Sequence, residues 1–145
     1  MDSPMGDNGQ AAQPKKKIVI VEDDEDFLAL VDMILADAGV EIIPALEGTQ
    51  GLKAIRAHKP DLVILDLLLP DMNGWEVFLR MRSEAASERT PVIILTSQGT
   101  RTDRTFSLQV ARVHDYLMKP CLPSQLRQSV ASALQRSSES LESTA

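Results

Sequence analysis

Short apolar runs alternate with segments of helical spacing five times along the middle of the chain. Runs of four or five apolar residues are typical of strands that are buried on both faces of a sheet. The expected strands are Lys17–Val21, Val40–Pro44, Leu62–Leu65, Val92–Leu95 and His114–Leu117. Repeated strand–helix alternation predicts an α/β fold, in which one parallel sheet carries helices on both faces. Glu41 and Pro44 indicate that the second strand lies at a sheet edge.

The segments between the strands carry apolar residues at the spacing of amphipathic helices. The expected helices are Glu25–Ala38, Thr49–Ala57, Gly74–Arg82, Arg101–Val110 and Pro123–Gln135. Asp24 can cap the first helix and Gly39 can end it. In the fourth helix we expect Phe106 and Val110 to face the core.

The length of 145 residues and the hydrophobic content of 43% fit one domain with a full core. We assign residues 16–136 to this domain. Residues 1–15, rich in Gly, Pro and Gln, are expected to form a disordered leader. Residues 137–145, rich in Ser and Glu, are expected to form a disordered tail or the start of a linker.

Charge and hydropathy exclude several classes of protein. The net charge of −6 argues against direct binding of nucleic acid, which requires a basic surface. No apolar run approaches the roughly 20 residues that span a bilayer, and the first residues lack the features of a signal peptide. The single cysteine, Cys121, excludes an internal disulfide. We therefore expect a cytoplasmic protein that makes no contact with membranes.

Polar residues follow the predicted strands at their carboxyl ends. They are Glu22, Asp23 and Asp24 after the first strand, Asp66 after the third, Thr96 after the fourth and Lys119 shortly after the fifth. The carboxyl ends of parallel strands share one edge, where α/β sheets bind ligands. Clustered carboxylates repel one another unless a cation joins them, and oxygen ligands favour Mg²⁺. A carboxylate can also attack phosphorus, while a lysine and Mg²⁺ neutralise the developing charge.

Each of these residues has an ordinary explanation when it is taken alone. Acids after the first strand stabilise the positive end of the following helix, which holds above all for Asp24. A single Lys119 would most often be a solvated surface residue, and Thr96 an ordinary strand end. Their occurrence together at one sheet edge is what favours a functional site.

The same residues resemble the motifs of the bacterial response regulator receiver domain. The matching segments are Ile18–Asp24, Leu65–Asp66 through Leu69–Pro70 to Gly74, Thr96–Ser97, and Asp115–Leu117 through Lys119–Pro120. The resemblance covers the chain from Lys16 to Gln135. It implies a flavodoxin-like, doubly wound parallel sheet of five strands in the order 2-1-3-4-5, with helices on both faces.

The resemblance also implies a role for each site residue. Asp66 would accept the phosphoryl group. Mg²⁺ would be held by Glu22, Asp23, Asp66 and the backbone carbonyl of Leu68, with Asp23 a more direct ligand than Glu22. Thr96 and Lys119 would bind the phosphoryl oxygens, and Thr96 and Tyr116 would act together as the switch. The Lys119–Pro120 peptide bond would be cis.

The activity implied by the resemblance is signalling by phosphorelay. A sensor histidine kinase or a phosphotransfer protein would supply the phosphoryl group from a phosphohistidine. The added charge would change a surface built from the fourth helix, fifth strand and last helix, which a downstream output protein or domain would bind. Phosphorylation could also drive formation of a homodimer. Such a domain is not an enzyme with a separate substrate, although it assists its own phosphorylation and dephosphorylation.

Three positions depart from the usual pattern of the family. Arg112 replaces a small residue, commonly glycine, before the fifth strand. Cys121 stands where an aromatic residue often follows the Lys-Pro pair, and Leu69 replaces a frequent methionine. None of these changes removes a group with a chemical role.

Three other functions compete with this interpretation. A pseudo-receiver would keep the fold and act as an unphosphorylated binding or dimerisation module, but the acid, hydroxyl and lysine set is intact. An aspartyl phosphatase commonly needs a second acid two residues after its nucleophile, where this chain has Leu68. A flavin-binding protein needs a phosphate-cradling loop after the first strand, where Glu22 to Asp24 would repel phosphate.

Overall fold

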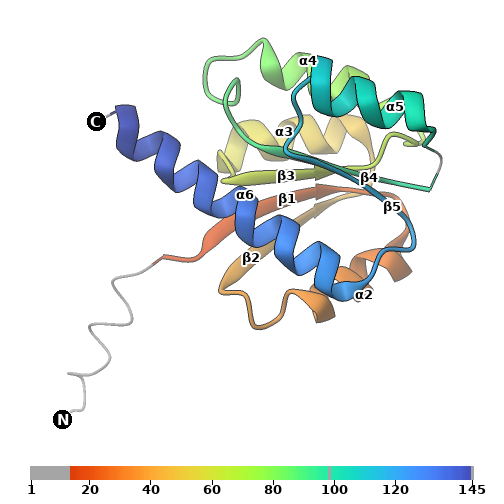
Figure 1. Cartoon of the computed structure of the whole chain (residues 1–145), viewed down its shortest axis with the longest axis horizontal. Helices are drawn as coiled ribbons and strands as arrows, with labels where there is room; N and C mark the ends of the chain where they lie inside the picture. The colour runs from red at the N-terminus through yellow and green to blue at the C-terminus, as the bar shows by residue number, and fades with distance from the viewer. Residues whose placement is uncertain (1–13, 98, 145) are drawn as a thin grey trace.

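A five-stranded parallel sheet lies between two layers of helices in the computed structural model, which describes residues 14–97 and 99–144 (Figure 1). The elements in chain order are β1 (Lys16–Val21), α2 (Glu25–Ile34), β2 (Val40–Ala45), α3 (Gly48–His58), β3 (Leu62–Leu65), α4 (Gly74–Arg82), β4 (Val92–Thr96), α5 (Arg101–Thr105), η1 (Phe106–Val110), β5 (Asp115–Met118) and α6 (Pro123–Thr144). Most of the expected leader, residues 1–13, lies outside the described residues.

The strands follow the order β2-β1-β3-β4-β5, and every pair is parallel. The predicted flavodoxin-like fold is therefore confirmed. The strand that contains Pro44 lies at an edge, as expected from its missing backbone donor. Helix α2 begins at the predicted cap, because the Asp24 side chain accepts a hydrogen bond from the backbone N–H of Phe27.

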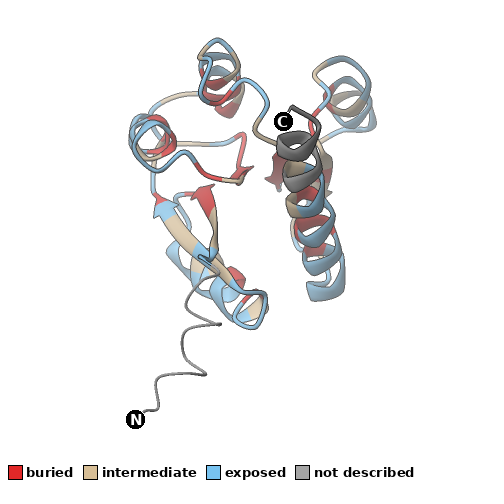
Figure 2. Ribbon diagram, turned by 90° about the vertical axis from the view of Figure 1, so that its left-hand side faces the viewer, coloured by how far each residue is buried: buried red, intermediate tan, exposed pale blue. Residues whose placement is uncertain are grey.

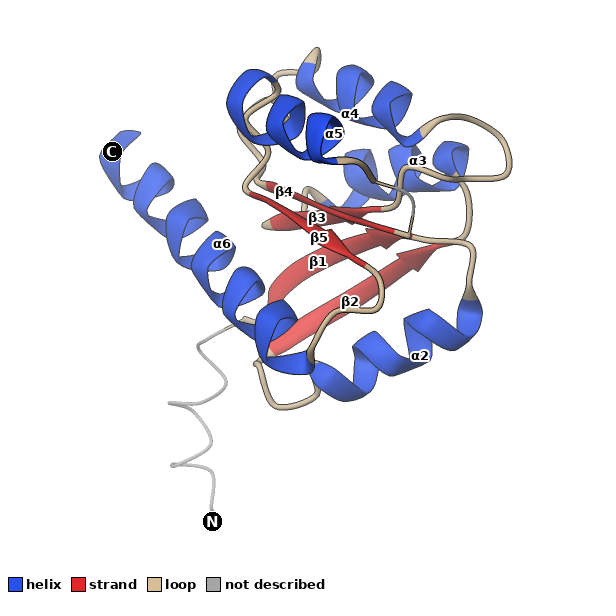
Figure 3. Ribbon diagram, turned by 45° about the vertical axis from the view of Figure 1, so that its right-hand side comes forward, coloured by secondary structure: helices blue, strands red, loops and turns tan. Residues whose placement is uncertain are grey.

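Successive residues of each strand point to opposite faces of the sheet, so the sheet divides the core into two clusters. Helices α3, α4 and α5 cover one face, and α2 and α6 cover the other (Figure 3). On the first face Val21, Leu65 and Ile94 pack against residues of α3 and α4. On the second, Ile20 and Ile64 pack against residues of α2 and α6. Figure 2 shows the buried residues gathered on the strands and on the inner faces of the helices.

The prediction for the fourth helix was wrong about its inner face. The segment begins as α-helix and continues as the π-helix η1, in which the N–H of Ala111 donates to the carbonyl of Phe106 at 2.9 Å. The wider turn changes which side chains face the sheet. Ser107 is buried, whereas Phe106 and Val110 are 47% and 67% exposed.

The last helix is longer than expected and continues to Thr144, through the stretch that we expected to be a disordered tail. After Pro123 the segment contains no proline and no glycine, and its serines are only mildly unfavourable in a helix. The composition that suggested a tail is therefore compatible with helix. Across residues 14–97 and 99–144, no helix combines the length and apolar character that a bilayer span requires.

Candidate functional site

Two buried carboxylates lie side by side at the carboxyl ends of neighbouring strands. Glu22 follows β1 and Asp66 follows β3, and the preceding residues Val21 and Leu65 are partners in the strand register. The N–H of Asp66 donates to the carbonyl of Val21 at 3.0 Å, which extends the pairing by one residue. Glu22 is 2% exposed and Asp66 5% exposed. Burial of ionised acids is costly, so this arrangement requires a positive partner.

Lys119 supplies that positive charge. Its Nζ donates hydrogen bonds to Oε1 of Glu22 and, at 3.0 Å, to Oδ2 of Asp66. The backbone N–H of Lys119 donates to the carbonyl of Thr96 at 2.9 Å, which fixes the lysine beside the end of β4. Nζ also lies 4.5 Å from the centre of the Phe27 ring, at the distance of a cation–π contact.

Burial and hydrogen bonding shift the pKa values of Glu22 and Lys119. Burial raises the pKa of Glu22, although the hydrogen bonds from Lys119 and from the N–H of Asp24 oppose the change. Burial alone would lower the pKa of Lys119, but its hydrogen bonds to the two carboxylates outweigh burial and raise that pKa. Lys119 is therefore firmly protonated between the two acids.

The acids at this edge form a group that could hold a metal ion. Asp23 is exposed beside the buried pair, and carboxylate oxygens of Glu22, Asp23 and Asp66 all lie within 4.8 Å of one another. Three ionised carboxylates and one ammonium group leave a formal charge of −2, which a divalent cation balances. Both oxygens of Glu22 already accept hydrogen bonds, from Lys119 and from Asp24. The exposed Asp23 is therefore better placed to bind a metal directly.

The loop after β3 holds Asp66 in place. Its Oδ1 accepts a hydrogen bond from the N–H of Leu68 at 3.1 Å, so both carboxylate oxygens have donors. Gly74 approaches this loop so closely that a Cβ atom there would stand 2.3 Å from the carbonyl oxygen of Asp66. A side chain at position 74 would displace the backbone of the aspartate.

Thr96 and Tyr116 lie on the neighbouring strands β4 and β5. Thr96 is the last residue of β4 and is fully buried. Tyr116 pairs in register with Ile94, and the residue is 2% exposed. Its hydroxyl has no hydrogen-bond partner among the described residues. The ring thus points into the protein but does not join the acid cluster.

Sequence reasoning missed two residues that shape the site region. Phe27 was interpreted only as an apolar residue of the first helix, yet it contacts Lys119. Asp71 caps α3 from the loop before α4, because its carboxylate accepts hydrogen bonds from the N–H groups of Gly48 and Thr49 at 2.7 and 2.9 Å. The one available signal for this cap was the lack of a Ser, Thr, Asp or Asn at position 47.

The Lys119–Pro120 peptide bond is cis.

Comparison with known proteins gives a consistent result. The family model for the response regulator receiver domain matches residues 18–131. The alkaline phosphatase synthesis transcriptional regulatory protein PhoP of Bacillus subtilis is 33% identical over 122 residues, which cover 84% of this chain and 50% of that protein. The DNA-binding response regulator MtrA of Mycobacterium tuberculosis is 33% identical over 125 residues, which cover 86% of this chain and 53% of the relative. The chain spans about half the length of these relatives.

Solved structures share the fold. A CheY-like response regulator receiver domain protein from Methanospirillum hungatei is 28% identical, with a TM-score of 0.78 over 87% of this chain and 98% of that one. The receiver domain of a Pseudomonas aeruginosa sensor histidine kinase is 25% identical, with a TM-score of 0.74 over 83% of this chain and 98% of that one. The latter structure has a magnesium ion coordinated in its active site cleft.

Proposed function

The chain belongs to the response regulator receiver domain family, and on that basis we propose that Asp66 accepts a phosphoryl group in a Mg²⁺-dependent signalling switch. The observation that carries the proposal is the setting of the Asp66 carboxylate. It is buried, it is held by Lys119 and by the N–H of Leu68, and it lies beside two further acids. A buried acid held in this way has a fixed direction of attack, which phosphoryl transfer requires.

In the proposed reaction an oxygen of Asp66 attacks the phosphorus of a phosphohistidine on a partner protein. A P–O bond forms and the P–N bond breaks, while the leaving imidazole nitrogen keeps the electron pair and takes up a proton. Lys119 turns from its carboxylate partners toward the new phosphoryl oxygens, and the Thr96 hydroxyl donates to one of them. Asp66 thereby becomes a mixed anhydride that water can hydrolyse.

The residues present fit a bound Mg²⁺, which would supply charge neutralisation at the phosphoryl oxygens. Asp23 and Asp66 would hold it directly, Glu22 would complete the acidic set, and the Leu68 carbonyl would be a backbone ligand. The formal charge of −2 on the four side chains is the feature that supports this assignment.

We propose that the phosphoryl group acts at a distance through Thr96 and Tyr116. Phosphorylation would draw Thr96 toward the site and favour the inward position of the Tyr116 ring. The surface beyond the ring includes the exposed Phe106, Val110 and Met118. Because it contains large apolar side chains, this surface is suited to binding another protein.

The partners we propose are a sensor histidine kinase or phosphotransfer protein upstream and an output protein or domain downstream, all in the cytoplasm. A phosphorylation-dependent homodimer is a further form of output. Both of the relatives above are transcriptional or DNA-binding regulators, and the matched part of each is about half its length. With a net charge of −6, the present chain is not expected to bind nucleic acid itself.

Intact mass after incubation with acetyl phosphate and Mg²⁺ tests the assignment. The wild-type chain should gain one phosphoryl group, about 80 Da, and Asp66→Asn should gain none. Asp32→Asn, which changes an exposed aspartate of α2, is the matched control and should gain the same mass as wild type. Without Mg²⁺ the gain should disappear. An unmodified wild-type protein that retains its circular dichroism spectrum would support the pseudo-receiver instead.

A further inference from the structure

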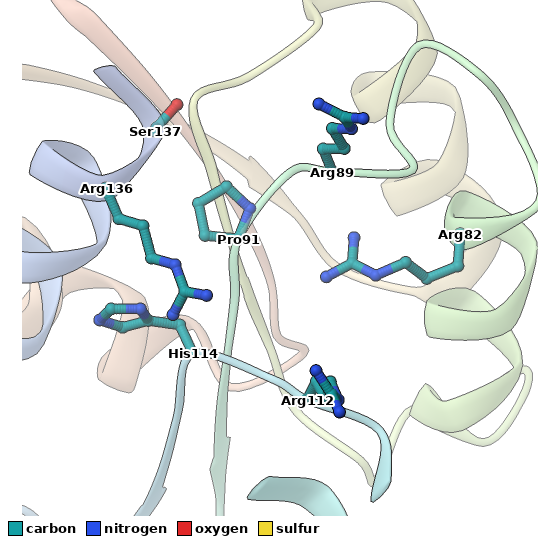
Figure 4. A pocket seen from close by; sticks show the side chains of 7 residues that line it. All are labelled: Arg82, Arg89, Pro91, Arg112, His114, Arg136 and Ser137. Atoms are coloured by element: carbon teal, nitrogen blue, oxygen red, sulfur yellow. The ribbon is translucent and has the colours of Figure 1, made fainter. Parts of the chain in front are cut away.

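A basic cavity of about 250 Å³ lies at the end of the sheet opposite Asp66. Figure 4 shows the side chains that line it. Its lining includes Arg82, Arg89, Pro91, Arg112, His114 and Arg136. Pro91 directly precedes β4 and His114 directly precedes β5, so the cavity opens at the amino ends of these strands. The acids of the proposed phosphorylation site follow the carboxyl ends. The two sites are therefore separated by the length of the strands.

The four arginines come from four different segments. Arg82 is the last residue of α4, Arg89 lies between α4 and β4, Arg112 lies between η1 and β5, and Arg136 belongs to α6. Arg82 and Arg136 extend toward Pro91 from opposite sides (Figure 4). The fold thus gathers positive charges that are far apart in the sequence.

No acid lines this cavity within the described part of the chain. Other arginines in the same protein do have acidic partners: Arg56 pairs with Glu84, and Arg80 pairs with Glu76. By contrast, no ion pair among the described side chains, those of residues 14–97, 99–101 and 103–137, involves an arginine of the cavity. Like charges that gather without counter-charges repel one another. In a chain of net charge −6 this arrangement is not a consequence of composition.

Two groups of the cavity are held in place before any ligand arrives. The guanidinium of Arg82 donates to the carbonyls of Ser87 and Thr90 at 3.1 and 2.7 Å, and it lies 4.9 Å from the centre of the Phe78 ring. The Nε2 of His114 lies 3.1 Å from the hydroxyl oxygen of Ser132. Its buried Nδ1 has no partner among the described residues. Buried ring nitrogens are normally hydrogen-bonded, so this one is an exception.

We propose that this cavity binds a small molecule through a chain of two or three phosphates. Arginine forks bind phosphate oxygens with paired hydrogen bonds, and several arginines match the charge of a di- or triphosphate. The arginines approach from several directions, which suits tetrahedral phosphate groups better than the planar carboxylate of an acidic side chain. The volume accommodates the phosphates, and the rest of the ligand extends through the open side of the cavity.

Isothermal titration with inorganic tripolyphosphate tests the proposal in a buffer free of phosphate and Mg²⁺. Wild-type protein should show saturable binding of one ligand. Arg89→Gln and Arg136→Gln each remove an exposed arginine of the cavity, so the fold should be retained, and each should weaken binding about tenfold or more. Arg127→Gln is the matched control, because it removes the same charge from an exposed position of the same helix as Arg136. It should change the affinity by less than about twofold.

Binding should be unchanged in Asp66→Asn, which separates this site from the proposed phosphorylation site. Side-chain Nε–Hε resonances of the wild-type arginines provide a second readout, and those of the cavity should shift on titration. The proposal is overturned if wild type shows no saturable binding, or if Arg127→Gln weakens binding as much as Arg136→Gln. It is also overturned if hexaglutamate binds more tightly than tripolyphosphate through the same arginines, which would identify an acidic protein segment as the ligand.

Discussion

The hydroxyl oxygen of Tyr116 lies 2.0 Å from the point at which a Cβ atom on Gly99 would stand. Two non-bonded atoms cannot lie this close together, so the inward position of the tyrosine ring requires a residue without a Cβ atom at position 99. The loop after β4 and the ring on β5 are therefore coupled by simple exclusion. This coupling offers a way to move the ring without changing the ring itself.

Gly99→Ala should displace the Tyr116 ring toward solvent. Burial raises the pKa of the Tyr116 hydroxyl, and Tyr116 is the sole tyrosine of the chain. In the variant we expect this pKa to fall toward its ordinary value of about 10. Absorbance of the phenolate during an alkaline titration measures the change, with Tyr116→Phe as the blank. Circular dichroism at each pH checks that the fold persists. An unchanged titration curve would contradict the coupling.

Lys119→Met should destabilise the domain when no divalent cation is present. The substitution leaves the buried carboxylates of Glu22 and Asp66 facing each other without the ammonium group. Breaking a buried ion pair by removing one partner costs about 3 kcal/mol. Urea unfolding in the presence of EDTA measures the loss.

Arg80→Gln provides the control for Lys119→Met, because it removes the cation of the exposed pair with Glu76. Surface pairs contribute little, so the control should change the free energy of unfolding by less than about 0.5 kcal/mol. Equal effects of the two substitutions would show that the buried position of Lys119 has no special importance.

Arg112→Gly should raise stability while it weakens the binding of tripolyphosphate. Arg112 has a φ of +57°, in the left-handed region that costs a side-chain-bearing residue energy. Relief of this strain should raise the free energy of unfolding by about 1 kcal/mol, after allowance for the greater conformational entropy of glycine in the unfolded chain. Lys59, with a φ of +46° after α3, should respond in the same direction when changed to glycine. Lys53→Gly, inside α3, should instead lower the free energy of unfolding by about 1 kcal/mol.

His114→Gln should reduce the pH dependence of stability near neutrality. Burial, and to a smaller extent the charge of Arg136, lowers the pKa of His114 in the folded protein. The unfolded chain, with a histidine pKa of about 6.5, then binds the proton more readily. Stability contributed by neutral His114 is therefore present above that pH and is lost as the pH falls toward the lower folded-state pKa.

Urea unfolding at a series of pH values in a phosphate-free buffer measures this effect of His114. His58→Gln is the matched control, since His58 is exposed at the end of α3. The slope of stability against pH should become smaller in His114→Gln than in His58→Gln. Identical slopes in the two variants would count against the role of burial.

The sheet and its acidic edge were predictable because each depends on local sequence patterns. Continuous apolar runs identified the buried strands, and the parallel arrangement then required that Glu22 and Asp66 meet at one edge. Periodicity could not reveal the π-helix, since a wider turn moves Ser107 inward without a signal in the apolar spacing. The length of α6 was missed because serine-rich sequence is common to tails and helices.

Features made by long-range contacts were hidden in the sequence. Asp71 caps α3 from more than 20 residues away in the sequence, and the local sequence shows only that position 47 lacks a capping residue, not which residue replaces it. The basic cavity is a clearer case, because each of its arginines resembles an ordinary surface residue until the fold brings them together. Only Arg112 was noticed beforehand, as a departure from glycine, and its positive φ gives the physical reason why glycine suits that position.

The hydrogen bond between Lys119 and Glu22 joins residues that are 97 positions apart. During synthesis of the chain the acids therefore emerge long before the lysine that neutralises them. A nascent or truncated chain that ends before β5 contains Glu22, Asp23 and Asp66 without this counter-charge, and their repulsion opposes closure of the unfinished sheet. We therefore expect the acidic cluster to oppose folding until the segment that carries Lys119 has been added.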